Sequence, residues 1–221
     1  MFIRVESSLR NRLPELSARL FVLRGVSIIR EKPDLESFKE EIFKEVNETW
    51  TSEGLKDHNI FRAYRSFFWR LGIDPTKIRP ASEALIRRTL RGKPIPKINT
   101  LVDAYNIASI VTLIPLAAFD EDILRGEPLM REAKKGERFR GIGMREDLTL
   151  NGGEIVIQDD EKLIAIYPYR DADSSKVTTG TKNVMMLVCG APGIDAKTLE
   201  QAETQTISIV TRFCGGTLTN P

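Results

Sequence analysis

Apolar residues in the first half of the chain fall into one continuous run and several segments with helical spacing. The run at residues 18–29 is rich in Val, Leu, Phe and Ile, which favours a buried strand that follows a short strand at residues 1–6. Residues 34–50 carry an apolar side chain at every third or fourth position, so they predict an amphipathic helix with Asp34 as its N-cap. Three further helices are expected at residues 60–72, 82–91 and 101–114, the second of them capped by Ser82.

The second half of the chain has a different pattern, in which short apolar runs are separated by turns. These runs lie at residues 128–133, 137–142, 148–150, 154–157, 162–169 and 181–190. The sequence Asn-Gly-Gly at residues 151–153 stands between two of them and predicts a tight hairpin, because asparagine and glycine accept positive φ angles. A last helix, with Asp195 as its N-cap, is expected at residues 195–216.

Helices and mostly antiparallel strands, without a regular βαβ alternation, predict an α+β fold with a central, mostly antiparallel sheet flanked by helices. The chain shows no clear linker, so we expect a single domain over residues 1–221. Within it, residues 1–80 are interpreted as a strand–helix extension packed on a core formed by residues 81–221.

Composition narrows the classes of function. The 221 residues are 41% hydrophobic and 29% charged, which is typical of soluble globular proteins, and no apolar run is long enough to cross a membrane. The N-terminus is charged from Arg4 onward, unlike a signal peptide, so a cytoplasmic location is expected. One histidine, His58, and two distant cysteines disfavour histidine-based triads and zinc sites, and neither a metal nor a cofactor is expected.

Basic residues are concentrated between residues 62 and 97. Ten lysines and arginines stand there against two acidic residues, so this segment carries a formal charge of +8 and the rest of the chain −6. Such asymmetry is compatible with a nucleic-acid partner, while two solvated helices with basic outer faces explain it equally well. The candidate phosphate contacts are Arg62, Arg65, Arg87, Arg88, Arg91 and Lys93.

A polar run at residues 170–182 separates two apolar runs and is rich in Asp, Ser, Thr and basic residues. This composition suits a ligand site. It also suits an ordinary loop in which Arg170 pairs with Asp171 or Asp173.

Several short motifs occur in a characteristic order. They are "LVDAYN", "PLAAFD", "DILRG", "LMREAKKGE" and "LTLNGGEIVI", followed by "DDEKLIAI" and "GTKNVMML". In this order, and over roughly residues 80–192, the chain resembles the B3/B4 domain of the phenylalanyl-tRNA synthetase beta chain. It resembles the free-standing relatives of that domain still more closely, because the likeness to them extends into the N-terminal helices.

The resemblance implies the α+β fold of the B3/B4 domain and a candidate activity. In the bacterial synthetase, this domain hydrolyses tyrosine that has been attached in error to tRNA. A pocket built for phenylalanine cannot strongly reject an isostere that adds only a hydroxyl, so a second site must hydrolyse the product. An aminoacyl ester is already activated, so positioning a water molecule on it can suffice.

Two positions depart from the synthetase motifs. The Thr-Asn pair of "VDxTN" reads Tyr105-Asn106 here, and the histidine of "PLHAFD" is replaced by Ala117. The synthetase glutamate aligns near residues 171–174. On this resemblance the catalytic candidates are Asp171, Asp173 and Thr179, and the substrate-binding candidates are Tyr105, Asn106, Tyr169, Arg170, Ser174, Thr178 and Lys182.

The partner implied by the resemblance is tRNA or the 3′ end of an aminoacyl-tRNA, and no membrane partner is expected. The function implied is RNA binding together with hydrolysis of mischarged aminoacyl-tRNA. Two alternatives stay open at this point. One is a non-catalytic module that binds RNA or protein, and the other is an enzyme that acts on an amino-acid-like small molecule in the same cleft.

Overall fold

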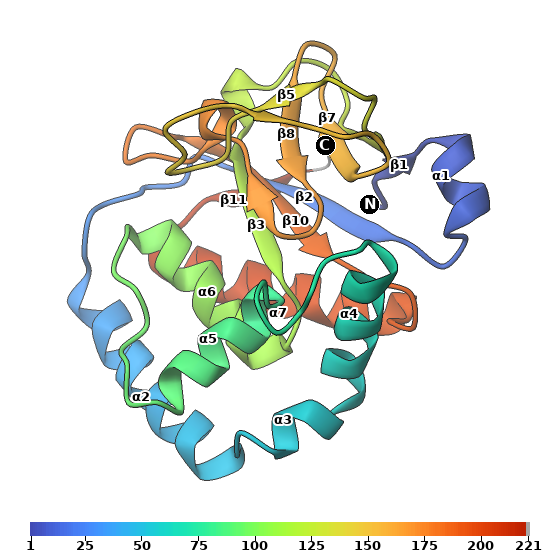
Figure 1. The fold of residues 1–221 in the computed structure, drawn as a ribbon. Coiled ribbons are helices and arrows are strands. Elements are labelled where there is room, and N and C mark those ends of the chain that lie inside the picture. The colour runs from blue at the N-terminus through green and yellow to red at the C-terminus, as the bar shows by residue number, and fades with distance from the viewer. Residues whose placement is uncertain (220–221) are drawn as a thin grey trace.

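A four-stranded antiparallel sheet lies at the centre of the protein (Figure 1). The computed structural model describes residues 1–219, and the strand order in this sheet is β11-β2-β10-β3. Its strands are β2 (Ala18–Arg24), β3 (Leu116–Asp120), β10 (Asn183–Cys189) and β11 (Thr217–Thr219). β2 comes from the N-terminal segment and lies between two strands from the C-terminal half, so this part of the segment is integral to the sheet.

The remaining strands form a second, five-stranded sheet with the order β1-β4-β7-β8-β9 and a small two-stranded pair, β5-β6. The bounds are β1 (Arg4–Val5), β4 (Leu129–Glu132), β5 (Arg138–Phe139), β6 (Leu148–Thr149), β7 (Ile155–Gln158), β8 (Leu163–Ile166) and β9 (Arg170–Asp171). All the pairings in the five-stranded sheet are antiparallel except that of β1 with β4. Two short 3₁₀ helices, η1 (Glu121–Ile123) and η2 (Asp173–Ser175), follow β3 and β9.

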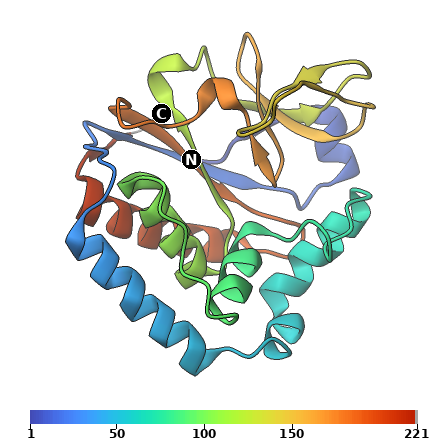
Figure 2. The same ribbon diagram turned by 60° about the vertical axis from the view of Figure 1, so that its left-hand side comes forward.

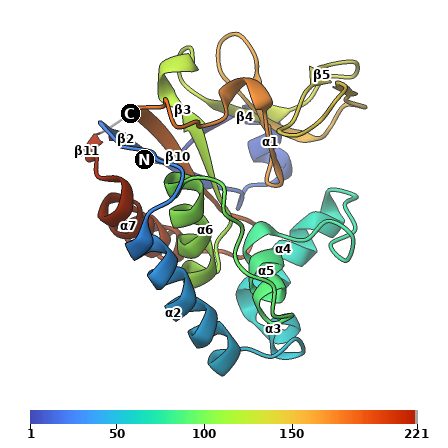
Figure 3. The same ribbon diagram turned by 90° about the vertical axis from the view of Figure 1, so that its left-hand side faces the viewer.

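Helices cover the face of the four-stranded sheet that is turned away from the second sheet (Figure 2). Their bounds are α2 (Pro33–Thr49), α3 (Gly54–Asp57), α4 (Asn59–Arg70), α5 (Ala81–Thr89), α6 (Thr100–Thr112) and α7 (Ala196–Cys214), whereas α1 (Ser7–Arg12) lies apart from them beside β4 of the second sheet. α6 and α7 pack against each other beside β2, β3 and β10, and α2 packs on the outer side of α6 (Figure 3). The α+β class and the mostly antiparallel central sheet are therefore confirmed. Within residues 1–219, no helix is both long and apolar enough to span a membrane.

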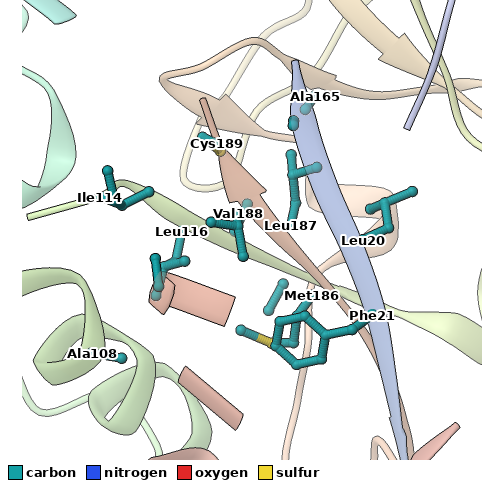
Figure 4. Packing of buried hydrophobic residues seen from close by; sticks show 14 of the residues in the cluster. Leu20, Phe21, Ala108, Ile114, Leu116, Ala165, Met186, Leu187, Val188 and Cys189 are labelled. Atoms are coloured by element: carbon teal, nitrogen blue, oxygen red, sulfur yellow. The ribbon is translucent and has the colours of Figure 1, made fainter. Parts of the chain in front are cut away.

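Side chains of the central strands alternate between these two layers, as the twofold period of a strand requires. Met186 of β10 faces Phe21 of β2 across the ladder, and Leu187 faces Leu20 in the next pair. Figure 4 shows Met186 with Phe21 on one side of the strands and Leu187 on the side of Ala165, which belongs to the second sheet. β10 is consequently buried on both faces.

Two of the expected helix caps were wrong. α2 begins at Pro33 with Lys32 as its N-cap, and α5 begins at Ala81 after Pro80. Proline suits the first position of a helix, because its fixed φ is already helical and its missing N–H would have no partner there. The cap predicted at the last helix is confirmed, since Asp195 accepts a hydrogen bond from the backbone N–H of Thr198 at 2.7 Å.

The hairpin predicted at Asn-Gly-Gly was also wrong, although its turn conformation is present. Gly152 and Gly153 have φ angles of 95° and 87°, and the Glu154 carboxylate accepts hydrogen bonds from the N–H groups of Asn151 and Gly152. The strands on either side do not pair with each other, because β6 pairs with β5 while β7 pairs with β4 and β8. The turn therefore connects two sheets.

A buried carboxylate holds α4 and α5 together. Glu83 of α5 is fully buried and accepts hydrogen bonds from Arg65 Nε of α4 at 2.9 Å and from Arg87 Nε of α5 at 2.6 Å. Burial raises the pKa of Glu83, but the two guanidinium groups outweigh this effect and hold it below its usual value. Glu83 is therefore an anion that two cations stabilise inside the protein.

We expect Glu83→Gln to lower the free energy of unfolding by about 3 kcal/mol at pH 7, because the substitution leaves two partly buried guanidinium groups without their counter-ion. Urea denaturation followed by circular dichroism measures the change. The matched control is Glu127→Gln, which removes the exposed pair with Arg4 and is expected to change stability by less than about 1 kcal/mol. Equal stability of the two variants would contradict this account of Glu83.

Candidate functional site

A cavity of about 180 Å³ lies between the two sheets, at the edge where α5 and α6 meet the strands. Its wall combines segments that are far apart in the sequence. The lining residues are Ala81, Tyr105, Asn106, Leu116, Ala117, Ala165, Ile166, Tyr167, Pro168, Tyr169, Asp171, Leu187 and Cys189. Figure 4 shows Leu187 and Cys189 of β10 on the side of Ala165, which belongs to the second sheet.

The strand register explains part of this wall. Ala117 of β3 is the cross-strand partner of Leu187, so both side chains lie on the face of the sheet that is turned toward β8. Cys189 lies two residues further along β10 and shares that face. The alanine at position 117 lines the cavity with only a methyl group, where the synthetase motif has a histidine.

Two tyrosine hydroxyls attach the neighbouring elements to the end of β10. Tyr64 of α4 donates a hydrogen bond to the carbonyl of Cys189 at 2.5 Å, and Tyr167 donates to the carbonyl of Gly190 at 2.5 Å. Gly190 itself cannot carry a side chain, because a Cβ there would lie 2.2 Å from the carbonyl oxygen of Ser17. This side of the cavity is therefore held by well-defined buried contacts.

α6 presents Tyr105 and Asn106 to the cavity from its middle turns. The helix begins at a strong cap, since Asn99 Oδ1 accepts a hydrogen bond from the N–H of Val102 at 2.9 Å. One turn before the cavity, the buried carboxylate of Asp103 accepts hydrogen bonds from Lys39 of α2 and from the N–H of Ile98. These contacts fix the rotation of α6 and so the direction in which Tyr105 and Asn106 point.

Asp171 is the one carboxyl group in the cavity wall. Its backbone is held in β9 opposite Ala165, and among the described residues no hydrogen bond or ion pair to its carboxylate is formed. Burial raises the pKa of Asp171 to about 7. Burial and the negative charge of Asp171 together raise the pKa values of the Tyr105 hydroxyl and the Cys189 thiol, so the carboxyl group lies near both.

The structure thus brings together four of the sequence-predicted site residues, Tyr105, Asn106, Tyr169 and Asp171. The others do not line the cavity. Asp173 pairs with Lys176 at 2.7 Å, and the Thr178 hydroxyl accepts a hydrogen bond from the N–H of Gly180. The remaining predicted residues, Arg170, Ser174, Thr179 and Lys182, are exposed.

Sequence reasoning did not identify Ala81, Ala165, Tyr167, Leu187 and Cys189 as parts of a site. These side chains belong to apolar runs, whose pattern predicts burial and does not distinguish a core position from a cavity wall. In the described part of the chain, no group of three or more His, Cys, Asp or Glu residues is arranged to hold a metal ion.

The basic segment divides into two parts in the structure. Arg65 and Arg87 are directed inward to Glu83. The other four candidate phosphate contacts are exposed, and these are Arg62, Arg88, Arg91 and Lys93. Arg88 also donates a hydrogen bond to the carbonyl of Pro94 at 2.7 Å.

Comparison with protein families gives a match to the model described as "B3/4 domain", over residues 63–215. The phenylalanine–tRNA ligase beta subunit of Fusobacterium nucleatum is 34% identical over 103 residues, which are 47% of this chain and 13% of that subunit. The corresponding subunit of Geobacter metallireducens is 32% identical over 110 residues, covering 49% of this chain and 14% of the subunit. The matched segments are thus only about a seventh of the length of these curated relatives.

Among solved structures, the chain is similar to an N-terminal fragment of the phenylalanyl-tRNA synthetase beta-subunit from Pyrococcus horikoshii. The TM-score is 0.52, the sequence identity is 15%, and the alignment covers 98% of this chain and 49% of that fragment. At this identity the likeness concerns the fold.

We expect Asp171→Asn to stabilise the protein at pH 8 by about 2 kcal/mol, because an amide in the cavity wall avoids burial of a charge. The pKa of Asp171 is higher in the folded than in the unfolded protein, so ionisation disfavours the folded state as the pH rises from about 4 to about 7. The difference between variant and wild type should therefore vanish near pH 4. Urea denaturation between pH 4 and pH 8 measures it.

Asp173→Asn is the matched control, since Asp173 forms its ion pair outside the cavity and should give no gain in stability at pH 8. A stability difference for Asp171→Asn that is independent of pH would contradict the burial of this carboxyl group.

Proposed function

The chain belongs to the B3/4 domain family, and on this premise we propose that it binds the 3′ end of tRNA and hydrolyses mischarged aminoacyl-tRNA in the cavity around Asp171. The similar proteins are beta subunits of phenylalanine–tRNA ligases, which supports tRNA as the partner. Such an activity belongs in the cytoplasm.

The single observation that carries this proposal is the unpaired carboxyl group of Asp171. A carboxylate removed from water is normally hydrogen-bonded or paired with a cation, as the fully buried Glu83 is, whereas Asp171 is half-buried in the cavity wall. Asp171 receives no such contact from the described residues, and its pKa of about 7 lies near the pH at which a general base works best. Perturbed ionisable groups of this kind are concentrated at functional sites.

The size of the cavity favours an aminoacyl group over a nucleotide as its occupant. Its volume of about 180 Å³ is below the roughly 300–1,000 Å³ that is usual for sites that enclose a complete drug-sized ligand. The lining is mostly apolar or aromatic, and Asn106 and Asp171 are its amide and its carboxylate. An amino-acid side chain can enter such a site while the ribose and phosphates stay outside.

The chemistry requires only one proton acceptor and one means of orientation. A water molecule held by the Asp171 carboxylate attacks the ester carbonyl carbon, and its proton passes to Asp171. The bond to the terminal ribose oxygen then breaks, and that oxygen takes up the proton, so the products are a free amino acid and uncharged tRNA. The Asn106 side chain can orient either the ester or the water. The methyl group of Ala117 cannot transfer a proton, so the Asp171 carboxyl group is the proton acceptor in this proposal.

Exposed basic residues on α4, α5 and the following loop supply the contacts to phosphate in this proposal. These are Arg62, Arg88, Arg91 and Lys93, and their contribution does not depend on the RNA sequence. No metal ion and no cofactor is needed for the reaction.

A second candidate function is binding or turnover of a free amino-acid-like molecule in the same cavity. The inward direction of Arg65 and Arg87 favours it, because it leaves fewer cations on the surface for a polyanion. A module that binds RNA or protein without catalysis is the third possibility, and the experiment below separates all three.

We expect the wild-type protein to release the amino acid from at least one member of a panel of mischarged tRNAs. The rate should rise with pH up to about 7 and then become constant, because the Asp171 carboxylate must be ionised to accept a proton. Asp171→Asn should lower the rate by at least about 100-fold and remove the pH dependence. Single-turnover deacylation of radiolabelled aminoacyl-tRNA measures both.

Asp173→Asn is again the control and should keep the wild-type rate, because Asp173 pairs with Lys176 outside the cavity. Intact esters together with salt-dependent tRNA binding would favour the non-catalytic module. If tRNA does not bind at moderate salt while a free amino acid does, the small-molecule function replaces the proposal.

A further inference from the structure

Trp69 is an exposed tryptophan on a helix. Its side chain lies in the last turn of α4 and the residue is 59% exposed, whereas Trp50 packs against Phe61 and His58. Single exposed apolar side chains are common on protein surfaces and need a second observation before they carry meaning. That observation is the set of residues beside Trp69.

The outer face of α4 consists of Arg62, Ser66, Trp69 and Arg70, all of which are exposed. Arg62, Ser66 and Arg70 follow one another at a spacing of four residues, and Trp69 lies three residues after Ser66, so each of the other three side chains neighbours Ser66 on the helix surface. Among residues 1–219, neither Arg62 nor Arg70 forms an ion pair with a carboxylate. No acidic residue occurs between Asn59 and Ile73, so Arg62 and Arg70 have no acidic neighbour on their own helix, whereas Arg65 is paired with Glu83.

The opposite face of α4 supports the wall of the cavity. The Tyr64 hydroxyl donates to the carbonyl of Cys189, and the ring centroids of Phe67 and Tyr167 are 6.3 Å apart. Cys189 and Tyr167 both line the cavity. The outer face of α4 is thus separated from the cavity wall by about one helix diameter, roughly 10 Å.

We propose that the outer face of α4 binds single-stranded RNA, with a base stacked on the Trp69 indole and the adjoining phosphates held by Arg62 and Arg70. Aromatic side chains within a basic surface are the usual platform for unpaired bases, since every base offers a stacking face. A duplex keeps its bases stacked on each other and cannot use such a platform. This inference rests on the proposed function, because the RNA bound on α4 would be the part of the tRNA next to the 3′ end that enters the cavity.

The charges favour this occupant over a protein or a membrane. A hydrophobic protein interface needs a contiguous apolar patch with few charges at its centre, but the other members of this exposed face of α4 are Arg62, Ser66 and Arg70. A membrane-binding helix needs several bulky apolar residues on one side, and the bulky apolar residues of α4 are buried in the core apart from Trp69 and the half-buried Ile60.

The protein contains only two tryptophans, so its fluorescence can be assigned to one of them. In a Trp50→Phe background, we expect a single-stranded hexa-adenylate to quench the Trp69 emission, and a hairpin duplex of the same length to quench it much less. Trp69→Ala should raise the dissociation constant of the single strand at least about fivefold. Fluorescence anisotropy of a labelled oligonucleotide measures this constant. Arg62→Gln and Arg70→Gln should each reduce the slope of log affinity against log salt by about 0.7.

Arg10→Gln is the matched control, because Arg10 is an exposed arginine on α1 and is expected to leave both affinity and slope unchanged. Unaltered affinity of Trp69→Ala, or equal quenching by single strand and duplex, would overturn the proposal. So would sedimentation that shows the wild type to be a dimer and Trp69→Ala a monomer, because the face would then contact a second copy of the chain.

The failure of this inference can be told apart from failure of the proposed function. If Trp69→Ala binds the oligonucleotide and deacylates tRNA as the wild type does, only the role of α4 is lost. If the wild type binds the hexa-adenylate through Trp69 but leaves every aminoacyl ester intact, the role of α4 stands and the hydrolytic activity is lost.

Discussion

Strand β10 is buried on both faces along its length, so its backbone polar groups must find their partners inside the protein. β2 and β3 supply these partners along the strand. At its end, where the ladder stops, the carbonyls of Cys189 and Gly190 accept the hydroxyls of Tyr64 and Tyr167. These two bonds bring α4 and the turn before β9 to the same place. The cavity lies at this end of the strand, and Tyr167 and Cys189 are part of its wall.

The fully buried Glu83 and the half-buried Asp171 lie in opposite electrostatic environments. Glu83 is surrounded by the guanidinium groups of Arg65 and Arg87, which lower its pKa and tie two helices together. Asp171 is given no cation, and burial alone raises its pKa. The first arrangement stabilises the protein and the second disfavours folding at neutral pH.

Much of the architecture follows from local patterns in the sequence. The helices at α2, α4, α6 and α7 were predicted within a few residues of their bounds, because each buries a stripe of apolar residues. The sequence did not predict which strands pair with each other. The Asn-Gly-Gly turn has the expected conformation, yet the strands beside it belong to different sheets. Which strands meet depends on long-range packing of apolar faces, and the local pattern does not contain that information.

The residues of the candidate site were likewise predicted only in part. Tyr105, Asn106 and Asp171 lie in the cavity wall as the motif resemblance led us to expect, whereas Asp173 does not. β9 ends at Asp171, and the chain turns at once into the 3₁₀ helix η2, so two aspartates two residues apart do not point to the same side. Arg65 and Arg87 were taken for surface cations because their counter-ion, Glu83, is only one acid among many bases in that segment.

The wall of the cavity is assembled from residues 81, 105–106, 116–117, 165–169, 171, 187 and 189, which come together only when helices and both sheets are in place. An occupant therefore binds the native protein and has no counterpart in the unfolded chain. By mass action, any molecule that fills the cavity raises the melting temperature in proportion to the logarithm of its concentration above its dissociation constant. A rise in the melting temperature of the protein therefore indicates which of the molecules tested occupies the cavity.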